Sequence, residues 1–330
     1  MLPAVALRCH GGLPPAACVE QAVAAERAGL SSVWFAENPY GRGAWPAATA
    51  CAVATRRLRI GLGVFNPYNR HPTLMAMEIA AFDELCEGRA VLGIGAGIPS
   101  RVSRMQVPTD RPIAAVRDAV TLTRRLLRGE TVTYAGKVFS ADGVRLELSP
   151  RRTDLPILTA AMGDQALRLC GELADGVIIS NLAPPAFTRR AVGIIREAAA
   201  RVGRSAPREV VQYVPCAVGD DGDDARRRAN AALSAMLISY WSRGTASAAT
   251  RAAIAEYNGL TAGEFAQAMA RLDRGEPLDD RLLAQYAVVG TPQECLAQCR
   301  AYAEAGVTEL ALAPVGEPGV EDITRLGRGL

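Results

Sequence analysis

The sequence predicts an α/β fold, a closed (β/α)8 TIM barrel with a helical insertion before its last strand. Three observations support this fold class. Short apolar runs alternate with amphipathic stretches along the whole chain, a pattern typical of a parallel sheet. Eight such runs remain once a small hairpin is set aside. The length of 330 residues suits one barrel with insertions, so we expect residues 1–330 to form a single domain.

Four strand–helix units are predicted in the first part of the chain. Their strands are Ala4–Leu7, Ser32–Ala36, Leu58–Val64 and Ala90–Ile94. Their helices are Ala16–Ala28, Pro46–Thr55, Thr73–Cys86 and Pro112–Leu127. Gly29, Gly88 and Gly129 stand where helices end, and Pro112 suits a first helical turn. The positions of these glycines and of Pro112 therefore agree with the helix bounds that the hydrophobic pattern predicts.

A β-hairpin over about 131–140 interrupts the pattern, with strands predicted at Thr131–Tyr134 and Val138–Ser140. The alternation then resumes. The remaining strands are predicted at Pro156–Thr159, Gly176–Ile179, Val210–Val218 and Thr308–Ala313. The remaining barrel helices are predicted at Gln165–Glu172, Phe187–Val202 and Thr291–Glu304. Residues 220–285 form the helical insertion, and Gly244, Gly259 and Gly275 break it into separate helices.

An open Rossmann-type sheet is the structural alternative. The strand count weakens it, and so does the lack of a G-x-G-x-x-G motif after the first strand. The glycines of Gly93–Gly97 follow the fourth strand instead, and a glycine cluster alone is a weak signal.

Composition excludes several classes of function. The net charge of +3 is spread among mixed acids and bases, which argues against a nucleic-acid partner. The eight cysteines are scattered without a C-x-x-C pair, and only two histidines occur, so we expect no metal site. No apolar run is long enough for a membrane span, and the N-terminus reads as a strand rather than a signal peptide. Free thiols then favour the cytoplasm.

The active site of such a barrel lies at the C-terminal ends of its strands. Few of these ends carry a charged residue, and none brings together a Ser-His-Asp set or paired carboxylates. Small residues and backbone dominate there. This composition is typical of a site in which a flat cofactor supplies the chemistry and the protein supplies shape and hydrogen bonds.

Five segments give the chain a resemblance to a known family. They are Ile60–Pro72, Phe82–Gly95, Leu126–Glu130, Gly171–Ile178 and Val288–Cys295. Together they resemble the luciferase-like superfamily in its coenzyme F420-dependent branch, with methylenetetrahydromethanopterin reductase as the nearest likeness. The likeness spans nearly the whole chain and thins at 96–110 and 220–285. It implies a deazaflavin cofactor, F420, with FMN as the alternative, and a homodimer.

The resemblance also implies where a cofactor binds. Gly63-Val64 matches a non-prolyl cis peptide that forms a bulge behind the cofactor ring; a glycine that only eases a tight strand end is the alternative. The segment Ala161–Gln165 opens a helix, whose free N–H groups attract phosphate; a plain turn capped by Asp164 is the alternative. The full set of cofactor-binding candidates is Gly63, Val64, Phe65, Asn66, Gly95, Ala96, Gly97, Ala161, Met162, Gly163, Asp164, Gln165 and Asn181.

Glu37 and Asn38 match an acidic residue followed by His in many relatives. Asn does not titrate near neutral pH, so Glu37 becomes the better candidate acid or base, unless it only pairs with an internal arginine. Glu37 and Asn38 are the candidate catalytic residues. The substrate-binding candidates are His10, His71, Arg101 and Arg104, although His71 before Pro72 also suits a packing or capping role and the arginines suit a solvated surface.

The sequence therefore predicts an oxidoreductase that transfers a hydride between F420 and a C=N, C=C or C=O group of a small molecule. Two alternatives stay open. One is an FMN-dependent monooxygenase, and the other is a cofactor-free barrel that serves as a binding protein, because fold alone does not determine function.

Overall fold

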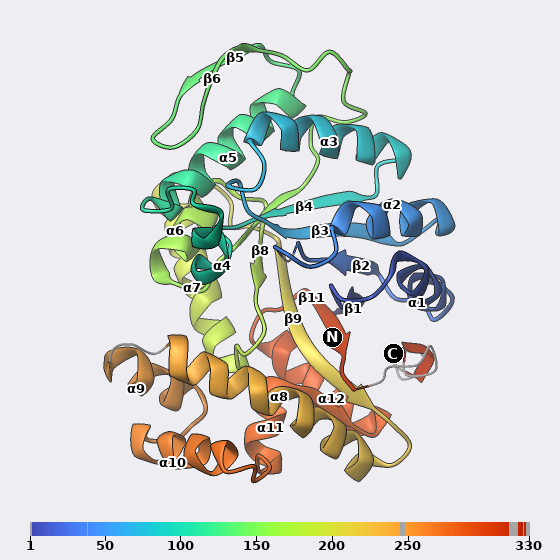
Figure 1. Ribbon diagram of the computed structural model, residues 1–330, viewed down its shortest axis with the longest axis vertical. Coiled ribbons are helices and arrows are strands. Elements are labelled where there is room, and N and C mark those ends of the chain that lie inside the picture. Colours follow the sequence, from blue (N-terminus) through green and yellow to red (C-terminus); the bar gives the residue numbers. More distant parts are fainter. Residues whose placement is uncertain (1, 38, 245–247, 317–322, 326, 328–330) are drawn as a thin grey trace.

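A parallel β-barrel forms the centre of the molecule (Figure 1). The computed structural model describes residues 2–37, 39–244, 248–316, 323–325 and 327. In this part of the chain eight parallel strands close on one another, in the order β1-β2-β3-β4-β7-β8-β9-β11. They are β1 (Ala4–Cys9), β2 (Ser32–Phe35), β3 (Arg59–Phe65), β4 (Ala90–Ile94), β7 (Ile157–Ala160), β8 (Gly176–Ile179), β9 (Glu209–Val218) and β11 (Glu309–Pro314). The predicted (β/α)8 fold class is confirmed.

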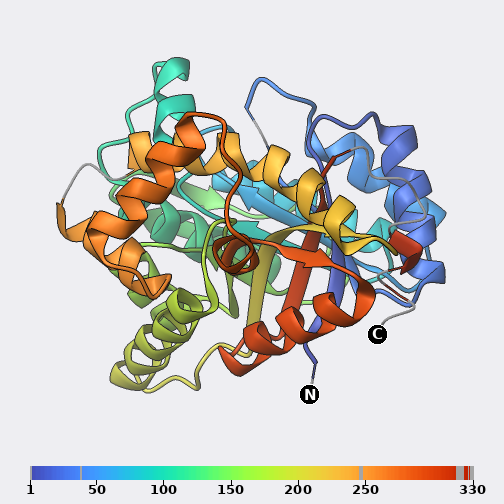
Figure 2. The same ribbon diagram turned by 90° about the horizontal axis from the view of Figure 1, so that it is seen from below.

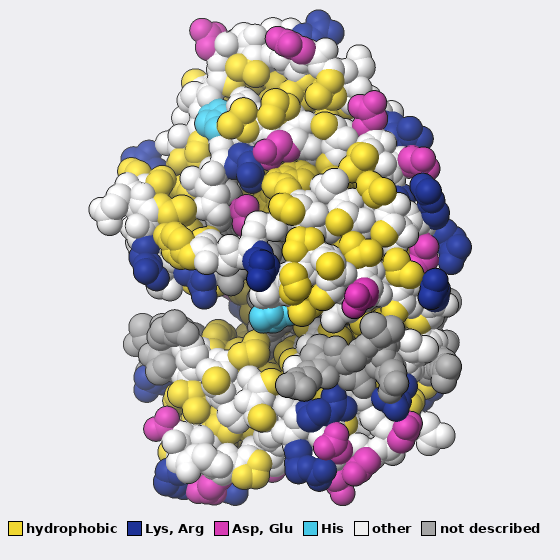
Figure 3. All heavy atoms as spheres, turned by 45° about the vertical axis from the view of Figure 1, so that its right-hand side comes forward, with side chains coloured by type: hydrophobic (Ala, Val, Ile, Leu, Met, Phe, Trp, Pro, Cys, Tyr) yellow, Lys and Arg dark blue, Asp and Glu magenta, His cyan; other side chains and the backbone are white. Residues whose placement is uncertain are grey.

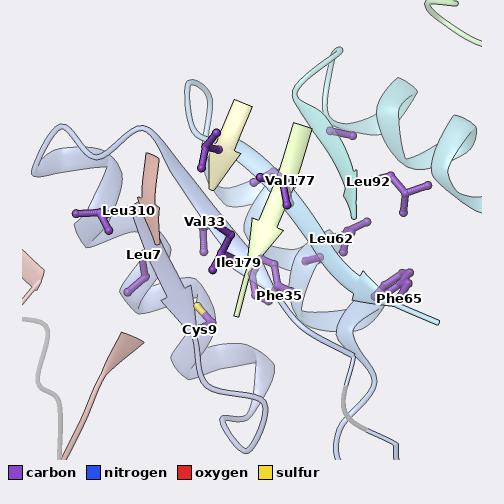
Figure 4. Close-up of a cluster of buried hydrophobic side chains, with 14 of the residues drawn as sticks. Leu7, Cys9, Val33, Phe35, Leu62, Phe65, Leu92, Val177, Ile179 and Leu310 are labelled. Atoms are coloured by element: carbon purple, nitrogen blue, oxygen red, sulfur yellow. The ribbon is translucent and has the colours of Figure 1, made fainter. Parts of the chain in front are cut away.

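Helices cover the outside of the barrel. They are α1 (Pro15–Arg27), α2 (Ala44–Ala54), α3 (Pro72–Leu85), α5 (Pro112–Leu127), α6 (Asp164–Leu173), α7 (Pro185–Arg201) and α12 (Pro292–Glu304). Alternate residues of each strand point outward beneath these helices, as Leu7, Val33, Leu62, Val177 and Leu310 do in Figure 4. A period of two along the strand thus separates an outer core from the barrel interior.

The barrel interior is filled rather than open. Trp34 of β2 lies across it and donates a hydrogen bond of 2.7 Å from Nε1 to the buried carboxylate of Glu309. Glycines on the neighbouring strand make room for the indole, because a Cβ at Gly61 would lie 2.2 Å from its Cδ2. Small inward residues on β3 thus make room for Trp34 of β2, which fills the barrel interior.

Two predicted element boundaries are corrected. The hairpin is formed by β5 (Val132–Ala135) and β6 (Ser140–Val144), so its second strand begins at Ser140 rather than ending there. The backbone N–H groups of Val138 and Phe139 donate to Asp118 of α5 instead of to the opposite strand. The sequence analysis also missed α4 (Pro99–Val102), the short helix η1 (Ser103–Met105) and β10 (Val288–Gly290), which pairs with β9.

The predicted insertion contains α8 (Gly222–Gly244), α9 (Ala248–Tyr257), α10 (Ala262–Asp273) and α11 (Asp280–Tyr286). Its helices lie at the end of the barrel opposite the N-terminus, where they appear in orange in Figure 2. Gly259 and Gly275 follow α9 and α10 with φ of +66° and +85°, as their predicted role as breaks requires. Buried Leu233 and Phe265 of the insertion share one cluster with Ala217 and Val289, so the insertion packs on the barrel strands.

Within the described residues, no helix is both long and apolar enough to cross a bilayer.

Candidate active site

A bulge in β3 lies at the upper end of the barrel, the end at which the parallel strands terminate. The peptide bond between Gly63 and Val64 is cis, as predicted, and the pairing of β3 with β4 shifts register between Leu62 and Phe65. The Tyr213 hydroxyl, from β9 across the barrel, donates a 2.6 Å hydrogen bond to the Gly63 carbonyl. Burial raises the pKa of Tyr213, so the phenol stays protonated and acts as a fixed donor.

The side chain of Val64 packs at the top of the barrel interior and is only partly buried. A Cβ at Gly95 would lie 2.6 Å from Val64 Cγ1 and 2.9 Å from the Ala160 Cβ, so glycine is required there. Val64, Gly95 and Ala160 thus form one close-packed floor. It carries no charge and suits contact with a flat, apolar ring face.

The two residues after Val64 have local structural partners. Phe65 is fully buried in the outer core, where its ring packs edge-on against Trp45 at 5.4 Å. The side-chain Oδ1 of Asn66 accepts hydrogen bonds from the backbone N–H groups of Tyr68 and Asn69, at 3.1 and 3.0 Å. Asn66 therefore holds the loop after β3, and its amide nitrogen is the group left for a ligand.

Glu37 follows the end of β2 and lies beside that loop. Its carboxylate accepts a hydrogen bond of 3.1 Å from Asn69 Nδ2 and lies 3.6 Å from Arg70 NH1. Arg70 also contacts Glu78 of α3 at 2.7 Å. Glu37 is thus paired with an arginine, which was the alternative to an acid–base role. Its side chain nevertheless keeps 14% exposure at the barrel mouth. Asn38 lies outside the described residues.

The loop after β4 closes against the loop after β2. Gly95 is buried, Ala96 partly buried and Gly97 exposed, with φ of +75° at Gly97. Arg101 donates a 3.1 Å hydrogen bond to the Pro39 carbonyl, and the Arg104 guanidinium lies 5.1 Å from the centre of the Tyr40 ring. Both candidate arginines therefore fasten the two loops together at the rim.

The start of α6 provides uncapped backbone donors. Gly163 occupies the N-cap position without a side-chain cap, and space lies open around its Cα. Asp164 instead forms a two-fold ion pair with Arg190 of α7, at 2.8 Å for each contact. Ala161 is buried, Met162 partly buried and Gln165 exposed. The alternative, a plain turn capped by Asp164, is therefore not what the structure shows, and the helix N-terminus is left available for an anion.

Three other candidates lie around the mouth. Asn181, just past β8, has a buried Oδ1 without a hydrogen-bond partner in the described chain. His10 is exposed after β1, and its Nδ1 accepts from the Gly12 N–H at 3.1 Å. His71 caps α3 through Nδ1 and packs edge-on against Phe139 at 5.6 Å. The capping alternative therefore describes His71 best.

Sequence reasoning missed Arg8, Asn69, Arg70 and Tyr213. Arg8 and Tyr213 occupy inward positions of β1 and β9, and strand alternation was the signal that could have found them. Asn69 and Arg70 lie in the Ile60–Pro72 segment already singled out, but their contact with Glu37 depends on the folded loop.

The site combines a small, uncharged floor with the Glu37 carboxylate, which lies in the loop after β2. Among the described residues, no three His, Cys, Asp or Glu side chains come together to hold a metal ion. Figure 3 shows the surface hollowed between the barrel body and the helices of the insertion. The arrangement can bind a flat ring against the floor and deliver or take one proton.

Comparisons with known proteins find related sequences and a similar fold. A model of the luciferase-like monooxygenase family matches residues 3–309. The 5,10-methylenetetrahydromethanopterin reductase of Archaeoglobus fulgidus is 30% identical over 92% of this chain and 91% of its own length. The F420-dependent glucose-6-phosphate dehydrogenase of Amycolatopsis mediterranei is 26% identical, with 90% and 87% covered. The solved tetrahydromethanopterin reductase of Methanopyrus kandleri superposes with a TM-score of 0.87 at 23% identity, covering 100% of this chain and 99% of the other.

Proposed function

The chain belongs to the luciferase-like monooxygenase family, and on that basis we propose that it is an F420-dependent oxidoreductase that acts on a C=N, C=C or C=O group of a small molecule. The observation that carries the proposal is the close-packed, uncharged floor of Val64, Gly95 and Ala160 at the C-terminal ends of the strands. The named relatives that use F420 support the choice of cofactor.

The described residues fit such a cofactor in two places. The floor offers a flat ring an uncharged surface, and the orphaned Oδ1 of Asn181 offers an acceptor to a ring N–H. The uncapped N-terminus of α6 offers backbone N–H groups to a phosphate, with Arg190 and Arg168 reducing the repulsion from Asp164. When bound, a deazaflavin supplies a donor or acceptor of hydride.

Glu37 is the group that can move a proton at this site. In the oxidation direction the Glu37 carboxylate accepts the proton that the substrate loses together with its hydride. In the reduction direction it takes up a proton from solvent and passes it to the atom of the double bond that does not receive the hydride. Asn69 orients that carboxyl group by its hydrogen bond, and Arg70 limits its motion. The barrel wall holds the reactants face to face, and this positioning accounts for a large share of the rate.

The proposal is tested by anaerobic recovery of oxidised F420 absorbance when reduced F420, enzyme and a panel of imines, enones and ketones are mixed. Turnover of one class, lost in Glu37→Gln while F420 still binds, supports the reading. Oxygen consumption with reduced FMN, without F420 turnover, would instead establish the FMN-dependent monooxygenase. Binding of neither cofactor would favour the cofactor-free binding barrel.

We also propose that the protein is a homodimer in solution. One face of α3 exposes Leu74, Met77 and Leu85, and the neighbouring helix α2 exposes Val53; these four side chains are 43–58% exposed. Figure 3 shows hydrophobic side chains gathered over this region. Such a patch on a soluble protein marks an interaction surface. Met77→Arg should convert the dimer to a monomer by analytical ultracentrifugation, while Val202→Arg, at an exposed apolar residue after α7, should not.

We further propose that residues 1–330 work as one domain in the cytoplasm. The shared cluster of Leu233 and Phe265 with Ala217 and Val289 supports a single folding unit, which should unfold in one thermal transition. The eight cysteines are buried free thiols, which suits a reducing compartment. Fractionation of the producing cells tests the compartment.

A further inference from the structure

Arg8 places a guanidinium inside the upper barrel. In β1 the outward residues Leu7 and Cys9 belong to the outer core, whereas Ala6 belongs to the interior cluster. Arg8 alternates with Leu7 and Cys9 and therefore points toward the barrel axis. Its Cζ lies 4.7 Å from the centre of the Tyr213 ring, and its Nε is enclosed without a hydrogen-bond partner.

No carboxylate of the described chain pairs with Arg8. Two other buried or half-buried arginines have carboxylate partners, whereas Arg89 donates to backbone carbonyls. Arg59 contacts Glu209 at 2.8 Å, and Arg152 contacts Asp83 at 2.9 Å. Glu37 at the barrel mouth is directed to Asn69 and Arg70 instead, and Glu309 inside the barrel accepts from Ser32 and Trp34. Arg8 thus carries a charge for which the described chain provides no counter-charge.

Burial lowers the pKa of Arg8, against the opposing influence of Tyr213 and Cys9, but an arginine keeps its proton at any physiological pH. A partly buried cation without a counter-charge costs stability, and a ligand that supplies the counter-charge would offset that cost. The cation–π contact with the Tyr213 ring restrains the position of the guanidinium. A planar donor held in this way matches the two oxygens of a carboxylate.

Arg8 is also close to the proposed reaction centre. Tyr213 contacts Arg8 through its ring and contacts the β3 bulge through its hydroxyl, 2.6 Å from the Gly63 carbonyl oxygen. An anion bound by Arg8 therefore lies within one side chain of the floor on which the cofactor ring is placed.

We propose that Arg8 selects the substrate by binding a carboxylate attached close to the double bond that is reduced. This inference rests on the proposed function for the reaction, but the anion site itself depends only on Arg8 and its surroundings. The substrate class is then an unsaturated or oxo carboxylic acid. The guanidinium also neutralises the negative charge of that carboxylate, which would otherwise repel the incoming hydride.

The test compares wild type, Arg8→Met and Arg8→Lys by thermal unfolding, with and without F420. The probes are crotonate with crotonamide, pyruvate with pyruvamide, and inorganic phosphate, all at millimolar concentration. Each acid should raise the wild-type Tm more than its amide, and Arg8→Met should abolish that difference. Without ligand, Arg8→Met should raise the Tm by about 2–4 °C, because an unpaired charge is removed.

Arg59→Met is the matched control. It removes an arginine that is paired with Glu209, so it should lower the Tm while leaving the acid–amide difference intact. Arg8→Lys should keep part of that difference, because it keeps the charge but loses the planar fork. Any substrate acid then found should bind Arg8→Met about 30-fold or more weakly.

Several results would overturn the proposal. A lower Tm of unliganded Arg8→Met would show a purely structural role, and equal shifts by acids and amides in wild type would show that no carboxylate site exists. Stabilisation by phosphate alone would assign a different anion. Loss of F420 affinity in Arg8→Met with unchanged acid binding would assign the charge to the cofactor. Failure of the wild type to bind F420 would refute the proposed function. The acid–amide comparison in the cofactor-free protein would still test the carboxylate site at Arg8.

Discussion

Gly95→Ala probes the floor on which the proposed site depends. The added methyl group would lie 2.6 Å from Val64 Cγ1 and 2.9 Å from the Ala160 Cβ, and neither neighbour is the end of a flexible side chain. Either Val64 or the strand end must move. Overpacking of this kind costs about 1–3 kcal/mol of unfolding free energy. For a chain of 330 residues, that loss lowers the Tm by about 1–4 °C.

Two assays follow the change. Calorimetry gives the Tm, and fluorescence titration gives the Kd for F420. We expect both to worsen, because the displaced Val64 no longer presents a flat surface. The double variant Gly95→Ala with Val64→Ala removes the closest contact and should recover part of both losses, with a coupling of about 1 kcal/mol or more.

Gly193→Ala is the matched control. Gly193 lies in α7, where an added Cβ meets nothing within 4 Å, so this substitution should leave Kd unchanged and stabilise the helix slightly. The reasoning is refuted if Gly95→Ala keeps the wild-type Tm and Kd, or if the double variant shows simply additive losses.

Three further predictions concern charged residues. Asp83→Asn should lower the unfolding free energy by about 2–4 kcal/mol in urea titration, because buried Asp83 accepts two 2.9 Å bonds from Arg152 and one from Ala90 N–H; a loss below about 1 kcal/mol would contradict this. Glu37→Gln should reduce kcat about 100-fold or more without changing the Kd for F420, and unchanged kcat would remove Glu37 from the mechanism. Burial by itself raises the pKa of Glu26, but the backbone N–H groups of Arg57, Arg56 and Leu58 lower it below its ordinary 4.5. The ionised carboxylate therefore stabilises the folded protein fully above pH 4.5, and this stabilisation is lost as the pH falls through the folded-state pKa. Glu26→Gln should therefore be about 1 kcal/mol less stable at pH 7, and the gap should close below pH 4.5; a gap that persists in acid would contradict the assignment.

The barrel could be predicted because its signals are local. Alternation of apolar runs with amphipathic helices fixes a parallel sheet, and Gly259 or Gly275 ends a helix through its own backbone conformation. The errors came from tertiary partners. Asp118 of α5 draws the N–H groups of Val138 and Phe139 out of the hairpin, and β10 is a three-residue strand recognisable only by its pairing with β9.

The candidate site was predictable only in part. The bulge at Gly63-Val64 followed from a family resemblance, because nothing in strand propensity distinguishes a cis peptide there. The pairing of Glu37 with Arg70 could not be assigned, since it depends on how the loop after β3 folds back. Arg8 was passed over because a single basic residue in an apolar strand gives no sign that its charge is unpaired.

The most direct test of the proposed function is a parallel fluorescence titration of the purified protein with oxidised F420 and with FMN. We predict micromolar binding of F420 and much weaker binding of FMN, with F420 affinity reduced in Gly95→Ala. Preference for FMN, or binding of neither cofactor, would contradict the proposal that this barrel is an F420-dependent oxidoreductase.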